Sequence, residues 1–580
     1  MTNQELRQSA MDDWRSAVTA VLRRSGRLAL EEAPPDVERL LSVETYDGIR
    51  IDPLYTADDV TVSWEQPGVT PFTRGSRPPG TPWEVRQRHD DTDPQRCATA
   101  IRNDVAGGVD SVWLSVGPAG IPLDALPVVL EAVDLRRTTV VLDAGPDVAD
   151  AFAALCAGGV APSGNLGLDP ALFPELALRC ATELPGMRAV TVDATVHHDA
   201  GGSDADELGC ALAAGVTHLR ALVVAGLRVP QALGQMEFRY AATADQFLTI
   251  AKLRAARRLW ARVAQLCGAP EAGAQRQHAV TSSVMMTARD PWTNMLRTTV
   301  AAFSAAVGGA DAITVQPYDS CLGVSDEPAR RLARNTLAVL REEAHLGRVA
   351  DPAGGSWYVE SLTDELAQRA WQWFTDIERA GGMAAALASG LVAERLAATW
   401  ERRAANLAHG VDRITGVSEF PDVHEVRPHR LARSAALPLL RHAAVFEALR
   451  DRVDRHTEAT GARPVVLLVP VGAAGAPETT WATNHFAVAG LTAEVAVATD
   501  ADGVAEALIR AGTTVACLCG GVDDPARTAE LTKALSNAGA TRIWATGKPS
   551  DRPGVDGYLH RGCDVVDALR STLDTLEVAE

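Results

Sequence analysis

The chain has 580 residues, of which 47% are hydrophobic, 22% charged and 5% aromatic, the composition of an ordinary globular protein with three or more domains or one large α/β barrel with additions. Its formal charge of -19 excludes general nucleic-acid binding, because backbone phosphates would be repelled unless a basic face were segregated. The nine cysteines form no CxxC pair, so neither a zinc site nor a disulfide framework is supported.

No apolar run approaches the ~18 residues that a membrane helix needs, and residues 1–26 lack the apolar core of a signal peptide. We therefore expect a cytoplasmic protein without membrane contact. Residues 4–25 predict an amphipathic helix, which either packs on its own chain or serves as a docking arm. Residues 33–82 are rich in Pro and Gly and predict an extended segment.

From Trp83 onward, short apolar runs alternate with helical patterns, as expected for parallel strands joined by right-handed crossovers. Eight strands are predicted, at residues 83–88, 111–116, 138–143, 164–168, 187–193, 238–242, 278–282 and 312–316. Helices are predicted between them, at residues 95–107, 205–214, 244–267 and 294–307. Eight strands over about 240 residues is the size of a TIM (β/α)8 barrel.

Helices at residues 327–345, 362–377 and 383–407 are predicted to follow the barrel. Four strands at residues 465–469, 494–497, 514–518 and 542–545 then alternate with helices, and this pattern predicts a flavodoxin-like (Rossmann-type) α/β domain. The predicted division is therefore an N-terminal helix and arm (1–82), a barrel with trailing helices (83–407), a linker that includes a helix at 436–456 (408–462) and the α/β domain (463–580).

The turn after the strand at 465–469 lies where such a domain usually holds a ligand. Residues 470–477 nevertheless contain no His, Asp, Lys, Ser or Cys, and the next helix is predicted to begin near Thr479. In the barrel, His197, His198 and Asp199 follow a predicted strand end. Such a cluster supports either acid–base chemistry or a hydrogen-bonded loop, and at most one of two adjacent histidines on extended backbone can face the barrel mouth.

Long motifs along nearly the whole chain resemble the adenosylcobalamin-dependent methylmalonyl-CoA mutases. They are residues 45–55, 71–75, 250–262, 287–288, 294–299, 331–343 and 351–366. The resemblance implies a barrel that threads acyl-CoA down its axis and a flavodoxin-like domain that caps it with cobalamin. It also implies the radical rearrangement of methylmalonyl-CoA to succinyl-CoA, in which the cofactor performs the homolysis.

Catalytic chains of that family carry Asp-x-His-x-x-Gly after the first strand of the cobalamin domain, with a Lys nearby. The matching positions here hold Ala474 for the Asp, Ala476 for the cobalt-ligating His and Pro470 for the Lys. A methyl group cannot ligate cobalt. The resemblance therefore implies a degenerate cobalamin-binding-like domain with no cofactor on this chain.

Catalytic barrels also carry a Tyr-His pair, the His bonding the substrate carbonyl, and here Thr195 and Val196 stand in those positions. On a strand, a shift of one residue would turn His197 to the other face. The loop after Arg74-Gly75 is shorter and lacks the family's tyrosines. Arg74 and Arg276 match positions that touch the CoA tail, so vestigial substrate contacts are expected there.

The resemblance, with these losses, implies that the chain is the family's non-catalytic small subunit. Its expected partner in a heterodimer is a large subunit that holds adenosylcobalamin and substrate. A docking platform for a GTPase chaperone of the mutase is compatible with that role. The alternative is an active acyl-CoA mutase barrel of the isobutyryl-CoA type that takes cobalamin from another chain. That alternative has to explain Thr195, Val196 and the retained degenerate domain.

Overall fold

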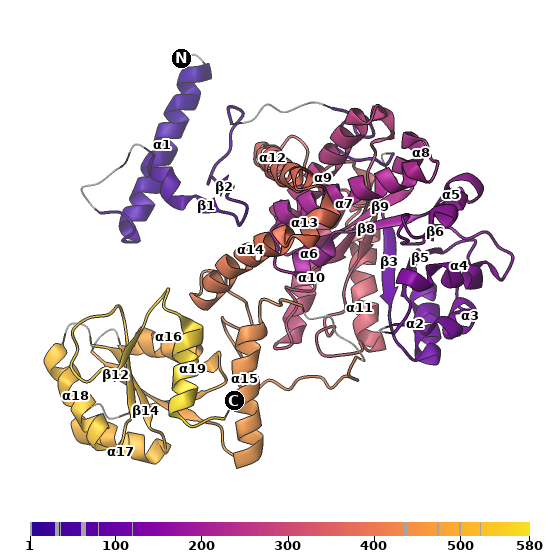
Figure 1. Ribbon diagram of the computed structural model, residues 1–580. Helices are drawn as coiled ribbons and strands as arrows, with labels where there is room; N and C mark the ends of the chain where they lie inside the picture. Colours follow the sequence, from indigo (N-terminus) through magenta and orange to yellow (C-terminus); the bar gives the residue numbers. More distant parts are fainter. Residues whose placement is uncertain are drawn as a thin grey trace.

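A computed structural model describes residues 3–29, 34, 36–59, 65–78, 80–118, 120–433, 439–472, 475–497, 500–521 and 524–579. Two α/β bodies are joined by long helices, and helix α1 (Asn3–Arg24) stands to one side of both (Figure 1). Ala474 lies outside the described residues, as does part of the helix predicted at 436–456, which the structure places at α15 (Ala444–Thr460).

The larger body is a parallel barrel, and its eight predicted strands are confirmed. The strands are β3 (Glu84–His89), β4 (Ser111–Ser115), β5 (Thr139–Asp143), β6 (Gly164–Asn165), β7 (Met187–Arg188), β8 (Val190–Asp193), β9 (Met236–Ala242), β10 (Arg276–Thr281) and β11 (Ala312–Thr314). The strand predicted at residues 187–193 is divided into two, β7 and β8. The sheet order is β7-β6-β5-β4-β3-β11-β10-β9-β8. Only Ala189 separates β7 from β8, so one strand pairs with β6 through its first half and with β9 through its second. This shared strand closes the barrel.

One group of helices surrounds the barrel strands, and a second group comes after the last barrel strand in the sequence. Around the barrel lie α2 (Pro94–Ala106), α3 (Leu126–Leu130), α4 (Val148–Cys156), α5 (Pro174–Glu183), α7 (Asp204–Val224), α8 (Val229–Gly234), α9 (Gln246–Leu266), α10 (Asn294–Val307) and α11 (Glu327–Ala338). The trailing helices are α12 (Trp357–Arg379), α13 (Met383–Ala388) and α14 (Leu391–Ala408). The prediction of one helix at 383–407 is wrong, because Gly390 adopts a left-handed φ of 85° and separates α13 from α14.

Helix α7 is the core helix of the barrel and runs ten residues beyond its predicted end. Among the described residues it is the one helix long and apolar enough to cross a membrane, and 61% of its apolar window is buried inside the protein. Its N-terminus is capped by Ser203 and Asp206, and Asp47 of the N-terminal arm accepts a hydrogen bond from the Ala205 amide at 3.1 Å. The arm is therefore fastened to the barrel at the start of α7.

The basic side chains of α9 form ion pairs and hydrogen bonds with the chain around them. Lys252 is fully buried and lies 2.6 Å from Glu207 and 2.8 Å from Asp204. Arg254 pairs with Asp351 and Glu360, and Arg257 donates to carbonyl groups of the segment before β3. These cations anchor α9 to α7, α12 and the arm instead of forming a solvated face.

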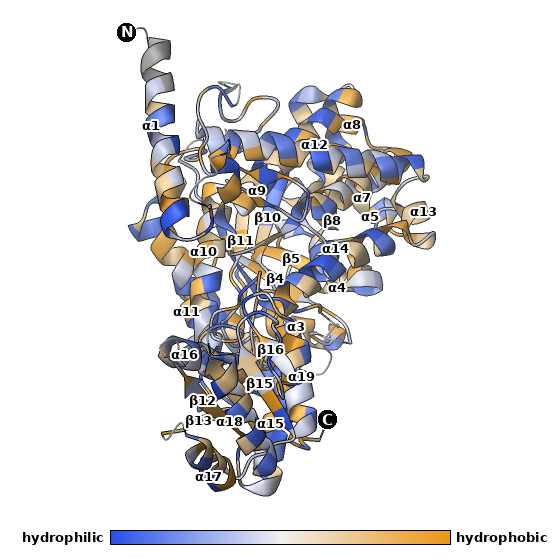
Figure 2. Ribbon diagram, turned by 90° about the vertical axis from the view of Figure 1, so that its left-hand side faces the viewer, coloured by the Kyte–Doolittle hydropathy of each residue, from blue (hydrophilic) through white to orange (hydrophobic). Residues whose placement is uncertain are grey.

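The smaller body confirms the flavodoxin-like prediction and adds one strand. Its elements are β12 (Val465–Val471), α16 (Gly475–Ala487), β13 (Thr492–Val495), α17 (Ala501–Ala511), β14 (Val515–Gly520), α18 (Pro525–Asn537), β15 (Arg542–Thr546), β16 (Gly557–Leu559) and α19 (Val565–Thr575). The parallel strand order β13-β12-β14-β15-β16 is the flavodoxin order. In Figure 2 the hydrophobic colour runs along its strands, whereas the covering helices carry both hydrophobic and hydrophilic residues.

Candidate functional site

The segment after β8 forms a short helix, α6 (Thr195–Asp199), so the expectation of extended backbone there is wrong. Thr195 donates to Asp193 Oδ1 at 2.6 Å, which starts the helix directly at the strand end. Val196 is 54% exposed at the barrel mouth. On a helix, a one-residue shift turns a side chain by about 100° rather than to the opposite face.

The two histidines of α6 differ in surroundings. His198 is buried, and its Nε2 lies 2.7 Å from Ser282 Oγ. His197 is half-buried, and burial lowers its pKa to about 4, with Asp193 opposing the shift. Burial and the charge of Asp193 raise the pKa of Asp199 to about 7. The geometry thus gives His198 the hydrogen-bonded role and leaves His197 neutral near pH 7.

Charged side chains near the N-terminal ends of the barrel strands meet across the axis, and we call them the lower layer. Arg86 of β3 bonds Glu237 of β9 at 2.5 Å, although β11 and β10 separate these strands in the sheet. Arg276 of β10 bonds Glu237 at 3.0 Å and also pairs with Glu84 of β3. Contacts between non-adjacent strands can form only through the lumen. Burial opposes ionisation of Glu237, yet Arg86 and Arg276 hold its pKa well below the ordinary value.

A second layer of side chains crosses the axis nearer the C-terminal ends of the strands, and we call it the upper layer. Trp113 of β4 is 4% exposed and has the guanidinium of Arg239 3.9 Å and that of Arg88 4.7 Å from its ring centroid. His278 meets its edge at 5.5 Å, and Arg239 pairs with Asp193 at 2.6 Å. Cations above an indole face are attracted by the ring quadrupole. The lumen is therefore packed with interlocking side chains at two levels.

Arg74 and Arg276, the two predicted CoA contacts, already have partners within the chain. Arg276 belongs to the lower layer of the axis. Arg74 pairs with Asp351 at 3.1 Å and donates to the Glu65 carbonyl at 3.0 Å. CoA contact stays a prediction, and a phosphate would have to displace these carboxylates.

At the edge of the C-terminal sheet, Pro470 and Ala476 are the two matching positions that lie within the described residues. Helix α16 begins at Gly475, four residues before the predicted start, so the exposed Ala476 lies in its first turn. A Cβ at Gly475 would lie 3.0 Å from Pro470 Cβ, so a side chain at this position would fit only if Pro470 shifted.

Comparisons with known proteins identify the family. The methylmalonyl-CoA mutase family model matches residues 44–120 and 172–460. The chain belongs to the methylmalonyl-CoA mutase family. A methylmalonyl-CoA mutase small subunit from Streptomyces virginiae is 49% identical, over 99% of this chain and 98% of the relative.

More distant members of the methylmalonyl-CoA mutase family also match. The small subunit from Propionibacterium freudenreichii subsp. shermanii is 38% identical, over 98% of this chain and 95% of its own length. A methylmalonyl-CoA mutase from Cereibacter sphaeroides is 29% identical, over 75% of this chain and 71% of its own length.

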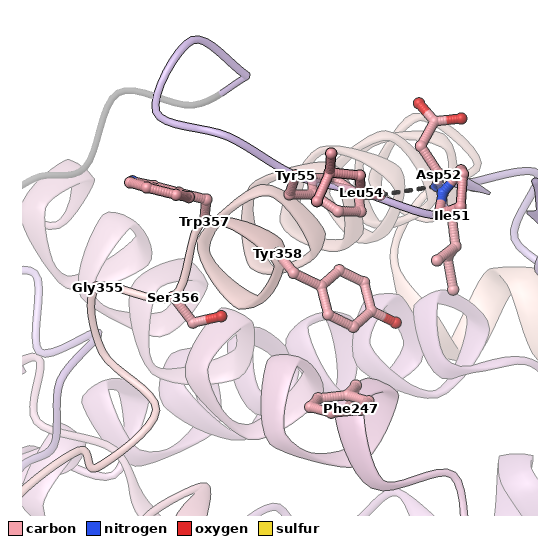
Figure 3. A pocket seen from close by; sticks show the side chains of 10 residues that line it. Ile51, Asp52, Leu54, Tyr55, Phe247, Gly355, Ser356, Trp357 and Tyr358 are labelled. Atoms are coloured by element: carbon pink, nitrogen blue, oxygen red, sulfur yellow. Dashed lines mark hydrogen bonds between the residues drawn. The ribbon is translucent and has the colours of Figure 1, made fainter. Parts of the chain in front are cut away.

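An aromatic groove lies on the outside of this mutase-family barrel, away from the axis. It encloses about 490 Å³ between the arm and the N-termini of α9 and α12 (Figure 3). Tyr358 lies 4.9 Å from Tyr55 and 5.0 Å from Phe247 between ring centroids. The rings pack on one another, so the groove chiefly seats the arm on the barrel.

His485 of α16 is a core residue of the C-terminal flavodoxin-like domain rather than a ligand. It is 4% exposed, it packs between Trp481 and Phe486, and its Nε2 has no hydrogen-bond partner. Burial lowers its pKa to about 4. Its side chain therefore stays neutral in the folded state under conditions that charge an unfolded histidine.

We expect this histidine to cost stability in acid. Because burial lowers the pKa of His485 in the folded state, the neutral side chain contributes fully to the free energy of unfolding above about pH 6.5. As the pH falls toward 4, the free energy of unfolding decreases by about 3 kcal/mol. Urea unfolding of His485→Phe should lack that part of the acid slope. His424→Phe, at an exposed position, is the control and should keep the wild-type slope; equal slopes in all three proteins would contradict the assignment.

Proposed function

We propose that this chain is the non-catalytic small subunit of a heterodimeric, adenosylcobalamin-dependent methylmalonyl-CoA mutase, the enzyme that converts methylmalonyl-CoA to succinyl-CoA. In this proposal the large subunit holds cofactor and substrate, and this chain supports it. The names of the relatives that match over nearly the full chain favour the proposal.

The observation that carries the proposal is the packed barrel axis. A thioester threaded along it would have to displace Trp113 from between two guanidinium groups and then break the Arg86–Glu237 and Arg276–Glu84 pairs. Separating the buried Arg86–Glu237 pair without replacement costs about 3–5 kcal/mol. The Arg276–Glu84 pair, whose side chains are 25% and 26% exposed, costs less to separate. A substrate that must pass two such layers does not reach a reactive position.

The flavodoxin-like domain also supports the assignment of this chain as a non-catalytic subunit. Catalytic chains of the family ligate cobalt through the imidazole of a His, and the residue at the matching position is Ala476, on the first turn of a helix. The donor set does not fit the cofactor, so no step of the reaction is assigned to this chain.

Titration of the purified chain with adenosylcobalamin and with methylmalonyl-CoA tests the proposal. We expect neither saturable cofactor binding nor turnover from the chain alone, and turnover when the large subunit is added. Saturable binding together with turnover by the chain alone would overturn the proposal. Turnover that needed a separate cobalamin-binding protein but not the large subunit would favour the isobutyryl-CoA-type alternative.

Rebuilding the cobalt loop should not restore catalysis. In Pro470→Lys/Ala474→Asp/Ala476→His the cofactor ligands return, but Val196 and the packed axis remain. We expect mutase activity to stay at background in a coupled succinyl-CoA assay. Measurable turnover by this triple variant alone would show that the axis is no barrier.

A further inference from the structure

A groove away from the barrel axis lies between α2 and the first turn of α11, the helices that follow the neighbouring strands β3 and β11 (Figure 1). It encloses about 540 Å³, within the ~300–1,000 Å³ typical of small-molecule sites. Residues 429–431 form its third wall, and the Val324 amide donates to the Leu431 carbonyl at 2.7 Å. We call this cavity the linker groove. A ligand in it would contact both the barrel and the linker.

Two polar groups of the linker groove lack hydrogen-bond partners among the described residues. Ser325 is 8% exposed, and its Oγ has no partner. Arg330 donates through Nη1 to the Ser325 carbonyl at 3.0 Å, whereas its Nε is buried without a partner. Buried polar groups nearly always have partners, so these exceptions call for a bound water, ion or ligand. An anionic group accepts hydrogen bonds from both a guanidinium and a hydroxyl.

The linker groove also contains one unpaired charge of each sign. Its remaining arginines and aspartates pair with one another, Arg96 with Asp91 at 2.8 Å and Arg430 with Asp326 at 2.7 Å. Glu327 and Arg330 form no ion pair within the part of the chain that the structure describes. A cation and an anion are therefore available to a ligand.

The two unpaired charges lie one turn apart on α11, a spacing at which opposite charges can meet. Elsewhere in the chain such a pair does form, between Asp376 and Arg379 at 2.7 Å. In the linker groove the Arg330 guanidinium is held at the Ser325 carbonyl instead. A ligand that carries both a carboxylate and an ammonium group would satisfy both side chains.

The wall formed by α2 indicates what the rest of the ligand is. Gln95, Thr99 and Asn103 are exposed and four residues apart, so they lie along one face of the helix. They offer amide and hydroxyl groups without charge. A polar, uncharged side chain on the ligand suits this wall.

We propose that the linker groove binds a polar, uncharged α-amino acid, whose carboxylate accepts hydrogen bonds from Arg330 and Ser325 and whose ammonium group contacts Glu327. This site is independent of the proposed function, because it uses no residue of the barrel axis or of the cobalt-loop positions. It would place a small molecule where the linker meets the barrel.

Isothermal titration calorimetry of the purified full-length chain with serine, threonine, asparagine and glutamine tests the proposal. We expect saturable binding of at least one of them, with a Kd of about 1 mM or tighter. Arg330→Gln and Glu327→Gln should each weaken that binding by about 10-fold or more, because each leaves one charge of the ligand without its counter-charge. Matched thermal melting curves would show that the variants fold.

Arg331→Gln is the control, since Arg331 is exposed on the same helix and outside the groove, and it should leave the affinity within about twofold. The desamino form of the tightest ligand, which lacks the ammonium group, should bind the wild type about 10-fold more weakly. Absence of saturable binding by all four amino acids, or binding that neither groove variant weakens, would overturn the proposal. A desamino acid that binds as tightly as its amino acid would overturn it as well, by showing a site for carboxylates alone.

Discussion

Replacing Lys252 by methionine is expected to lower the free energy of unfolding of the barrel by about 3–5 kcal/mol. The ammonium group lies between Glu207 and Asp204 with no exposed surface. Burial alone would lower the pKa of Lys252, but the two carboxylates more than offset this effect and raise it. Without the cation, the fully buried Glu207 loses its counter-charge. Urea denaturation followed by circular dichroism measures the loss.

The double variant Lys252→Met/Glu207→Gln supplies the control. Removing the orphaned carboxylate should recover more than half of the lost stability, since a neutral amide can still accept the hydrogen bond of the Ala241 amide. Two variants of equal stability would show that Lys252 acts through packing of its methylene chain instead of through charge.

The second large effect is expected at the barrel axis, where Trp113→Ala should cost about 3–5 kcal/mol. The indole fills the space between Arg88 and Arg239 and contacts the edge of His278. Its removal leaves a void bounded by cations and an aspartate, which water enters. The midpoint of thermal unfolding measures the loss.

The control for this variant is Trp292→Ala, at a half-exposed tryptophan, which should change stability by less than about 1 kcal/mol. We expect no methylmalonyl-CoA binding by Trp113→Ala, because the lower layer of ion pairs still closes the axis. Tight CoA binding by the single variant would show that the tryptophan alone blocks the path.

The barrel and the flavodoxin-like domain could be predicted because their signals are local. Apolar runs such as residues 138–143 and 465–469 indicate buried parallel strands, and helical periodicity fills the intervals between them. Strand β16 was missed because Gly557–Leu559 is three residues long at the sheet edge and has no pattern of its own. The break at Gly390 needed knowledge of a backbone angle.

The packed axis could not be predicted because it depends on which strands face each other. Arg86 and Glu237 are 151 residues apart, and neither position is unusual alone. One signal was present: Glu84, Arg86 and Arg88 alternate along a single barrel strand, so all three point into the lumen. Three charges on an inward face of a barrel imply partners on opposite strands.

The absence of a cobalt-ligating His at Ala476 could be read from the motif, and its meaning for cofactor binding stays a prediction. The early start of α16 and the close approach of Gly475 to Pro470 could not be predicted, because they are visible only in three dimensions.

The two-layered lumen also bears on how such a chain can change over generations. Arg86, Arg276, Glu84 and Glu237 share their bonds, so any single substitution toward an open channel strands a buried charge and lowers stability before it creates space. Opening this lumen by single substitutions therefore passes through less stable intermediates. A lumen that is closed by mutually dependent pairs favours retention of the closed state.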